Sequence, residues 1–153
     1  MPDGIALRFA FEIRAQIATP VSGGAGRYGL RRIIAITGGT VDGPRLTGRV
    51  LPGGADYALR RADGCSRVEA HYVIEADDGT PIYVHNTGLF IAGPEVFARM
   101  DAGQRPSAED YYFRTAPVFD APDGPHGWLS DRLFVAEARF APAEVTIRVH
   151  EVR

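Results

Sequence analysis

Two Asp-Gly pairs, each set between segments of alternating polar and apolar residues, constrain this chain more than any other feature of its sequence. Asp63-Gly64 separates Asp56–Arg61 from Arg67–Ala76, and Asp78-Gly79 separates Arg67–Ala76 from Pro81–Thr87. An Asp-Gly pair in this setting is the strongest short-range signal for a β-hairpin, because the glycine adopts the positive φ that the turn requires. The middle of the chain is therefore predicted to be an antiparallel meander.

The rest of the chain follows the same pattern. Period-2 alternation or short β-branched runs predict further strands at residues 7–17, 32–37, 46–51, 111–115, 133–140 and 144–152. Pro94–Gly103 is the one segment typical of a helix, with proline near its start and glycine at its end. Pro20–Gly29 and Ala116–Gly127 are predicted to be loops. The prediction is an all-β fold, a single antiparallel up-and-down β-barrel of about eight strands spanning residues 1–153.

Composition narrows the function classes. A net charge of -2 argues against a nucleic-acid partner, which would require a basic face. All 17 basic residues are arginine, so no lysine can form a Schiff base. The single cysteine, Cys65, excludes an internal disulfide and a cysteine-based metal cluster. No apolar segment approaches membrane-spanning length and no signal segment is evident, so we expect a cytoplasmic protein without a membrane partner.

Two motifs bear on cofactors. Gly24–Gly29 (GAGRYG) matches GxGxxG, but a proline-containing loop precedes it and a strand follows, so the dinucleotide fingerprint is absent. Glu69, His71 and His85 lie on one predicted hairpin. A two-residue turn would place His71 and His85 on opposite faces, whereas a three-residue Asp77-Asp78-Gly79 loop would place them on one face. With no second cluster to support a metal, we expect neither a metal nor a cofactor.

Polar residues with strand periodicity indicate the candidate site. Asp56 follows glycines that let the chain bend at a barrel corner, Glu69 and His71 share one face of their strand, and Tyr112 and Arg114 share one face of theirs. A barrel interior holding these groups could bind a polar ligand and move protons. An outward polar face on each strand is an equally good interpretation.

A long series of residues resembles the DUF3237 family, also called UPF0311. The series is Gly38-Gly39, Gly43-Pro44, Gly48, Pro52–Asp56, Asp63-Gly64, Glu69–Tyr72, Asp78-Gly79, Ile82–Gly88, Tyr112–Thr115, Pro117, Phe119 and Trp128-Leu129. The resemblance implies a small antiparallel barrel similar to allene-oxide-cyclase and calycin-like barrels. Glu69 stands where the family often has aspartate, and His71 where it often has arginine.

We favour a cofactor-independent cyclase, isomerase or lyase acting on a small hydrophobic metabolite; the alternative is a lipocalin-like carrier. In the enzyme, Asp56 or Glu69 is the base and Arg114 holds a carboxylate or an enolate oxygen. Tyr72, Tyr83 and Tyr112 are the predicted proton donors. Asn86 is predicted to orient the substrate, and His71 to contribute to binding. Trp128 is predicted to anchor a loop that caps the barrel mouth. Edge strands are compatible with a homodimer or a similar small assembly.

Overall fold

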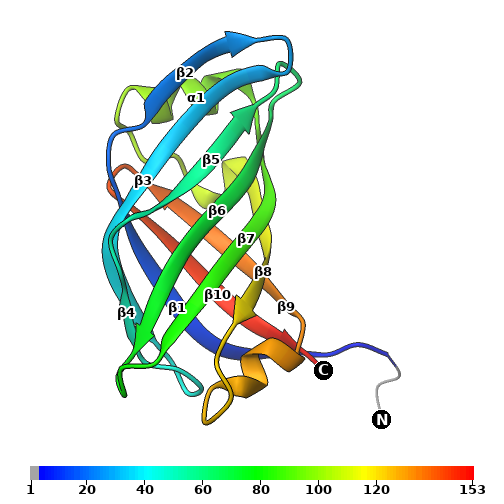
Figure 1. The fold of residues 1–153 in the computed structure, drawn as a ribbon. Coiled ribbons are helices and arrows are strands. Elements are labelled where there is room, and N and C mark those ends of the chain that lie inside the picture. Colours follow the sequence, from blue (N-terminus) through cyan, green and yellow to red (C-terminus); the bar gives the residue numbers. More distant parts are fainter. Residues whose placement is uncertain (1–3) are drawn as a thin grey trace.

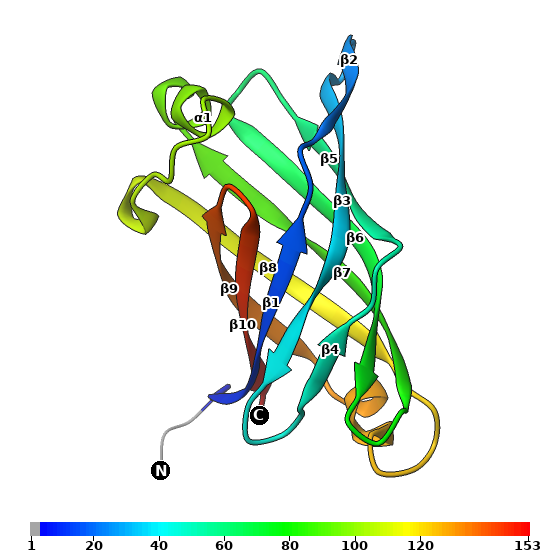
Figure 2. The same ribbon diagram turned by 90° about the vertical axis from the view of Figure 1, so that its left-hand side faces the viewer.

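In a computed structural model of the chain, which describes residues 4–153, ten β-strands form one antiparallel sheet that closes on itself (Figures 1 and 2). The strands are β1 (Leu7–Ile17), β2 (Val21–Gly26), β3 (Gly29–Asp42), β4 (Gly48–Val50), β5 (Gly54–Arg60), β6 (Cys65–Ala76), β7 (Pro81–Ala92), β8 (Tyr111–Asp120), β9 (Phe134–Ala141) and β10 (Glu144–Val152). An α-helix, α1 (Pro94–Asp101), and two 3₁₀ turns, η1 (Ala108–Asp110) and η2 (Gly127–Asp131), complete the described elements.

The strands occupy eight positions around a barrel. From β6 to β10 each strand pairs with the next, β10 pairs with β1, and β1 pairs with β3 to close the circle. The short strands β4 and β5 both pair with β3 and β6, so together they fill one position. β2 extends only the end of β3. The predicted antiparallel barrel of about eight strands is confirmed.

Closure depends on an unusually close approach at Gly39. This residue pairs with Ala15 of β1 on one side and with Val50 of β4 on the other. Its φ is +147°, a conformation that L side chains rarely adopt. A Cβ atom at this position would lie much closer to the Arg14 carbonyl oxygen than van der Waals contact allows. β3 therefore continues past residue 37, where the predicted strand ends, and meets β1 at Gly38 and Gly39.

The two ends of the barrel are filled differently. At the lower end in Figure 1, Phe119 packs against both Phe11 and Phe134, and Trp128 packs against Phe134, with ring centroids 5.1–5.8 Å apart. Leu129 of η2 closes this end and is 1% exposed. α1 lies at the opposite end, which is hollow. No helix among residues 4–153 has the length and apolar composition needed to span a membrane.

Two predicted loops are partly strands. Val21–Gly26, inside the predicted loop Pro20–Gly29, is β2, and all six of its residues are exposed. Because neither face is buried, β2 has no alternation of side chains from which a strand could be predicted. The predicted loop Ala116–Gly127 begins as the second half of β8, which continues to Asp120. Pro117 obscured the alternating burial of β8, because proline is rare inside a sheet. In the structure Pro117 lies opposite Asn86 of β7, beyond the two residues of β8 that pair with β9.

The turn after β6 resolves the alternative left open by the sequence. Ala76 and Thr80 close a three-residue loop, and Gly79 has a φ of +87°. This register pairs His71 directly with His85, so both imidazoles lie on one face of the sheet.

Substitution of Gly39 tests whether closure limits stability. We expect Gly39→Ala to lower the free energy of unfolding by roughly 2–4 kcal/mol, because the added methyl group meets backbone atoms and the φ is strained. Gly26→Ala is the matched control, since its Cβ would enter open space. Denaturant unfolding measures both variants, and equal stabilities would show that the β1–β3 seam can separate without cost.

Candidate functional site

The upper half of the barrel encloses a cavity of about 510 Å³. Its walls are mostly apolar, and their largest side chains come from strands on all sides and from α1. They include Ile17, Leu30, Ile34, Ile36, Val68, Phe90, Phe97, Met100, Phe113, Phe140, Val145 and Ile147. A mostly apolar, concave space of this size with few polar groups is typical of a small-molecule site.

Three buried, uncharged polar groups face this cavity without a protein partner. Among the residues that the structure describes, the Tyr72 hydroxyl, the Asn86 carbonyl oxygen and the Thr115 hydroxyl accept or donate no hydrogen bond. The side chains are 2–5% exposed. Leaving a buried polar group unpaired costs about 1–3 kcal/mol, so such groups usually meet water or a ligand. Burial also raises the pKa of the Tyr72 phenol, which therefore keeps its proton at neutral pH.

Asp56 is the carboxyl group of the cavity wall that forms no ion pair within the described part of the chain; the other, Asp101, is paired with Arg60. Asp56 lies on β5 after the turn at Pro52-Gly53. In the sheet it lies opposite Ala70 of β6, which in turn lies opposite Asn86 of β7, so the three residues form one row across the strands. Two strand spacings separate Asp56 from Asn86, about 10 Å between Cα atoms, with only the small Ala70 between them. Asp56 Oδ1 accepts a hydrogen bond from the Glu69 amide at 2.9 Å.

The surroundings of Asp56 favour its protonated form. Burial raises the pKa of the Asp56 carboxyl to about 6 from an ordinary 3.8, the largest effect. The hydrogen bond from the Glu69 amide and the charge of Arg32 act against the rise, and the charge of Glu69 adds to it. A carboxyl group with a pKa near neutrality can both accept and return a proton.

An ion pair fastens α1 to the mouth of the cavity. Arg60 at the end of β5 donates two hydrogen bonds to Asp101 at the end of α1, at 2.9 and 3.1 Å. Its guanidinium also lies 4.2 Å above the ring of Phe97. Arg32 lies 3.9 Å from the same carboxylate. The hydrogen bonds from Arg60 lower the pKa of Asp101, so the pair is ionised across the neutral range.

The structure brings only three of the predicted site residues into the cavity: Asp56, Tyr72 and Asn86. Tyr112 and Arg114, predicted to point inward, line an open groove on the outside of the barrel, where Tyr112 is 51% exposed. Their neighbours Phe113 and Thr115 face inward instead. The face of β8 that carries Phe113 is buried. Because side chains alternate along a strand, Tyr112 and Arg114 on the other face point into solvent.

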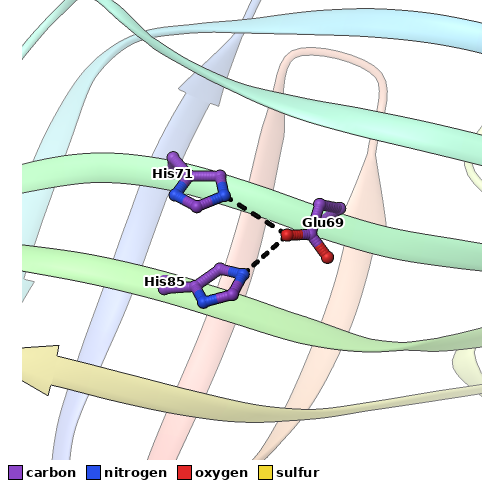
Figure 3. A group of neighbouring side chains, drawn as sticks. All are labelled: Glu69, His71 and His85. Atoms are coloured by element: carbon purple, nitrogen blue, oxygen red, sulfur yellow. Dashed lines mark hydrogen bonds and ion pairs between the residues drawn. The ribbon is translucent and has the colours of Figure 1, made fainter.

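Glu69, His71 and Tyr83 also lie on the outer wall, which corrects the prediction of inward-facing side chains. Figure 3 shows Glu69 and His71 of β6 beside His85 of β7. Tyr83 is 45% exposed and contacts His71.

Trp128 belongs to the packed lower end, with the Arg45 guanidinium 3.9 Å above its ring. The loop before Trp128 therefore caps the closed end and not the mouth.

Sequence reasoning missed Arg32, Arg60 and Thr115. Arg60 follows Asp56 by four residues on one strand, so period-2 alternation places both on the same face. That signal was available once Asp56 was assigned to the interior. Asp101 could not be found in this way, because its place at the mouth depends on how α1 folds back over the barrel.

Comparison with known proteins identifies the family. Residues 5–152 match the family model described as "Protein of unknown function (DUF3237)". The chain belongs to this family. A UPF0311 protein of Rhodopseudomonas palustris is 36% identical over 152 residues, 99% of either chain. A crystal structure from the same organism superposes with a TM-score of 0.92 at 35% identity, with both chains covered completely.

Proteins of other organisms are also similar to this chain in fold or in part of the sequence. A β-barrel-like protein of Acinetobacter baumannii is 28% identical, with a TM-score of 0.86 over 100% of this chain and 99% of the other. An enzyme of Penicillium herquei shares the fold at 20% identity, with a TM-score of 0.75 over 100% and 98% of the chains. A hydroalkoxylation enzyme of that fungus is 40% identical over 55 residues, 36% of either chain.

The raised pKa of Asp56 predicts how stability changes with pH. The carboxyl of Asp56 titrates near 3.8 in the unfolded chain and near 6 in the folded DUF3237 barrel. Below both values the group is protonated in both states and costs nothing. As pH rises from about 3.8 to about 6, the unfolded chain loses this proton while the folded protein keeps it, so stability falls progressively by up to about 3 kcal/mol and changes little above pH 6.

Asp56→Asn removes the charge and keeps an acceptor for the Glu69 amide. We expect the variant to be more stable than wild type by about 1–3 kcal/mol at pH 8 and equal to it near pH 4. Guanidinium unfolding at the two pH values measures the difference. A difference that does not change with pH would contradict the raised pKa.

The Arg60–Asp101 pair predicts a local effect at the mouth. Asp101→Asn should loosen α1, so that its amides exchange up to about tenfold faster while β6 and β7 exchange as before. Glu95→Gln on the same helix is the control, because Glu95 forms no ion pair among the described residues. Hydrogen exchange read by mass spectrometry separates the two segments, and unchanged exchange in α1 would show that the pair does not hold it.

Proposed function

We propose that this protein is a cofactor-independent acid–base enzyme that binds a largely hydrophobic metabolite in the upper half of the barrel and moves a proton on it through Asp56. The observation that carries the proposal is the composition of the cavity: a carboxyl group with a raised pKa, Asp56, and three uncharged polar groups without a protein partner among the described residues, set among mostly apolar walls below the Arg60–Asp101 ion pair at the mouth. A water-poor site of this kind strengthens each electrostatic interaction with the substrate.

Each polar group has a distinct role in the proposal. The Tyr72 phenol, which keeps its proton, donates a hydrogen bond to a substrate carbonyl oxygen and stabilises the negative charge that develops there. Asn86 and Thr115 fix the position of a substrate hydroxyl by hydrogen bonds. Asp56 accepts the hydroxyl proton and returns it to carbon. The side chains Phe90 and Phe113 hold the hydrocarbon part of the substrate.

The addition of a hydroxyl group across a conjugated carbon–carbon double bond is the reaction class that fits these roles. The oxygen attacks the β-carbon as Asp56 takes its proton, so a C–O bond forms and the C=C π bond is lost to an enolate held by Tyr72. Asp56 then protonates the α-carbon. All atoms stay in the product and no electrons leave, so the step needs no redox partner. The partial similarity to a hydroalkoxylation enzyme supports this class.

The proposal is tested with a panel of hydroxy-enones. The loss of enone absorbance measures consumption of the substrate, and NMR identifies the isomeric product. Asp56→Asn should lower kcat by roughly 10²–10⁴-fold, while Asp42→Asn on the exposed end of β3 leaves turnover unchanged. Turnover should fall as pH drops through 6, because the base is then protonated. Displacement of the neutral fluorophore N-phenyl-1-naphthylamine reports substrate binding separately.

Two outcomes would overturn this proposal. Recovery of every panel member unchanged, although it displaces the fluorophore, would make the protein a carrier. Full turnover by Asp56→Asn would remove the carboxyl group from the chemistry.

A further inference from the structure

Three side chains that commonly bind metal ions converge on the outer wall of the barrel (Figure 3). Glu69, His71 and His85 each offer one ligand atom, and these atoms all lie within 4.8 Å of one another. We propose that they form a binding site for a divalent transition-metal ion, with Zn²⁺ as its representative. The site is separate from the cavity, because the three side chains lie on the opposite face of the sheet from Asp56, Tyr72 and Asn86.

Two of the distances between the ligand atoms can be compared with those of a tetrahedral site. With metal–ligand bonds of about 2.0–2.1 Å, neighbouring ligand atoms are roughly 3.3 Å apart. His71 Nε2 lies 3.3 Å from Glu69 Oε1, and His85 Nε2 lies 2.6 Å from the same oxygen in a hydrogen bond. Replacing the proton of that hydrogen bond by an ion would lengthen the separation of His85 Nε2 and Glu69 Oε1 by about 0.7 Å.

The sheet holds the ligands in place before an ion arrives. His71 and His85 are directly opposite in the β6–β7 ladder, and Glu69 is the next outward residue on β6. The imidazole rings are stacked, with centroids 4.2 Å apart and planes inclined by 13°. Two imidazolium cations in this position would repel each other, whereas two neutral rings sharing a metal ion would not.

Tyr83 is a hydrogen-bond partner for the ring nitrogen of His71 that would not bind the metal; metal-ligating histidines usually have such a partner. Its hydroxyl lies 2.6 Å from Nδ1 of His71, the ring nitrogen that faces away from Glu69. With a metal on Nε2, Nδ1 carries the proton and donates a hydrogen bond to the Tyr83 oxygen. Such contacts fix the tautomer and orientation of a ligating imidazole.

The donor set selects the class of ion. Two imidazole nitrogens and one carboxylate suit Zn²⁺ and related transition metals, whereas Ca²⁺ and Mg²⁺ prefer oxygen ligands. The three side chains are 36–47% exposed, so solvent can reach the remaining coordination position. Water or an anionic ligand would complete the coordination there.

Isothermal titration of chelator-treated protein with ZnCl₂ tests the proposal. We expect one ion per chain. Tyr83→Phe should weaken binding about tenfold, and Glu69→Gln, His71→Gln and His85→Gln should each weaken it further. His150→Gln is the matched control, because His150 lies on β10 beside Phe9 and outside the cluster. It should bind Zn²⁺ as wild type does.

Co²⁺ provides a second, direct measurement. Visible absorption typical of a tetrahedral Co²⁺ site should appear with wild type and His150→Gln and be absent with His85→Gln, while far-UV circular dichroism of all variants stays unchanged. The proposal is overturned if wild type binds no Zn²⁺. It is also overturned if His85→Gln binds as tightly as wild type, or if binding is lost instead in His126→Gln, beside Asp78 at the lower end.

Discussion

The pairing of β1 with β3 is the contact on which the rest of this structure depends. Without it the sheet would have two long free edges and no interior. The pairing brings the backbones of Gly39 and Arg14 closer than any side chain would allow. It also fixes the position of the first half of β3, which pairs with β2 on one side and with β5 on the other. Through β5 the seam determines where Asp56 lies.

A closed barrel of eight positions is just wide enough for its interior to be filled or to hold one small ligand. This chain does both, in different halves. Below the row of Asp56 and Asn86, aromatic rings from β1, β8 and β9 meet across the axis. In that row and above it the short side chains of Ala70 and Ala58 leave part of the interior unfilled, and a cavity remains. Asp56, Tyr72 and Asn86 gather near the boundary between the two halves.

Much of the fold was predictable because it depends on local chemistry. The Asp-Gly turns at Gly64 and Gly79 gave the order of the hairpins, and the alternation gave the faces of most strands. The site was less predictable, because alternation separates two faces without saying which one is interior. For β8 the charged face, with Tyr112 and Arg114, was assigned to the interior although Phe113 is the buried residue. Asp56 was placed correctly since its strand begins at a corner where glycines bend the chain.

Residues that depend on long-range contacts could not be predicted at all. Asp101 reaches Arg60 only because α1 returns over the mouth. The pairing of His71 with His85 depends on whether the turn between β6 and β7 has two residues or three, because one residue shifts the register. β2 has no buried face, so only its backbone partner shows that it is a strand.

The division of the barrel into a packed and a hollow half has an evolutionary consequence. Substitutions that change side-chain volume in a packed core usually destabilise a protein, but the walls of an existing cavity can gain or lose atoms at small cost. The hollow half can therefore diverge in shape while the packed half preserves folding. A single ancestral barrel of this type could give rise to descendants that accept different molecules, without first acquiring a more stable scaffold.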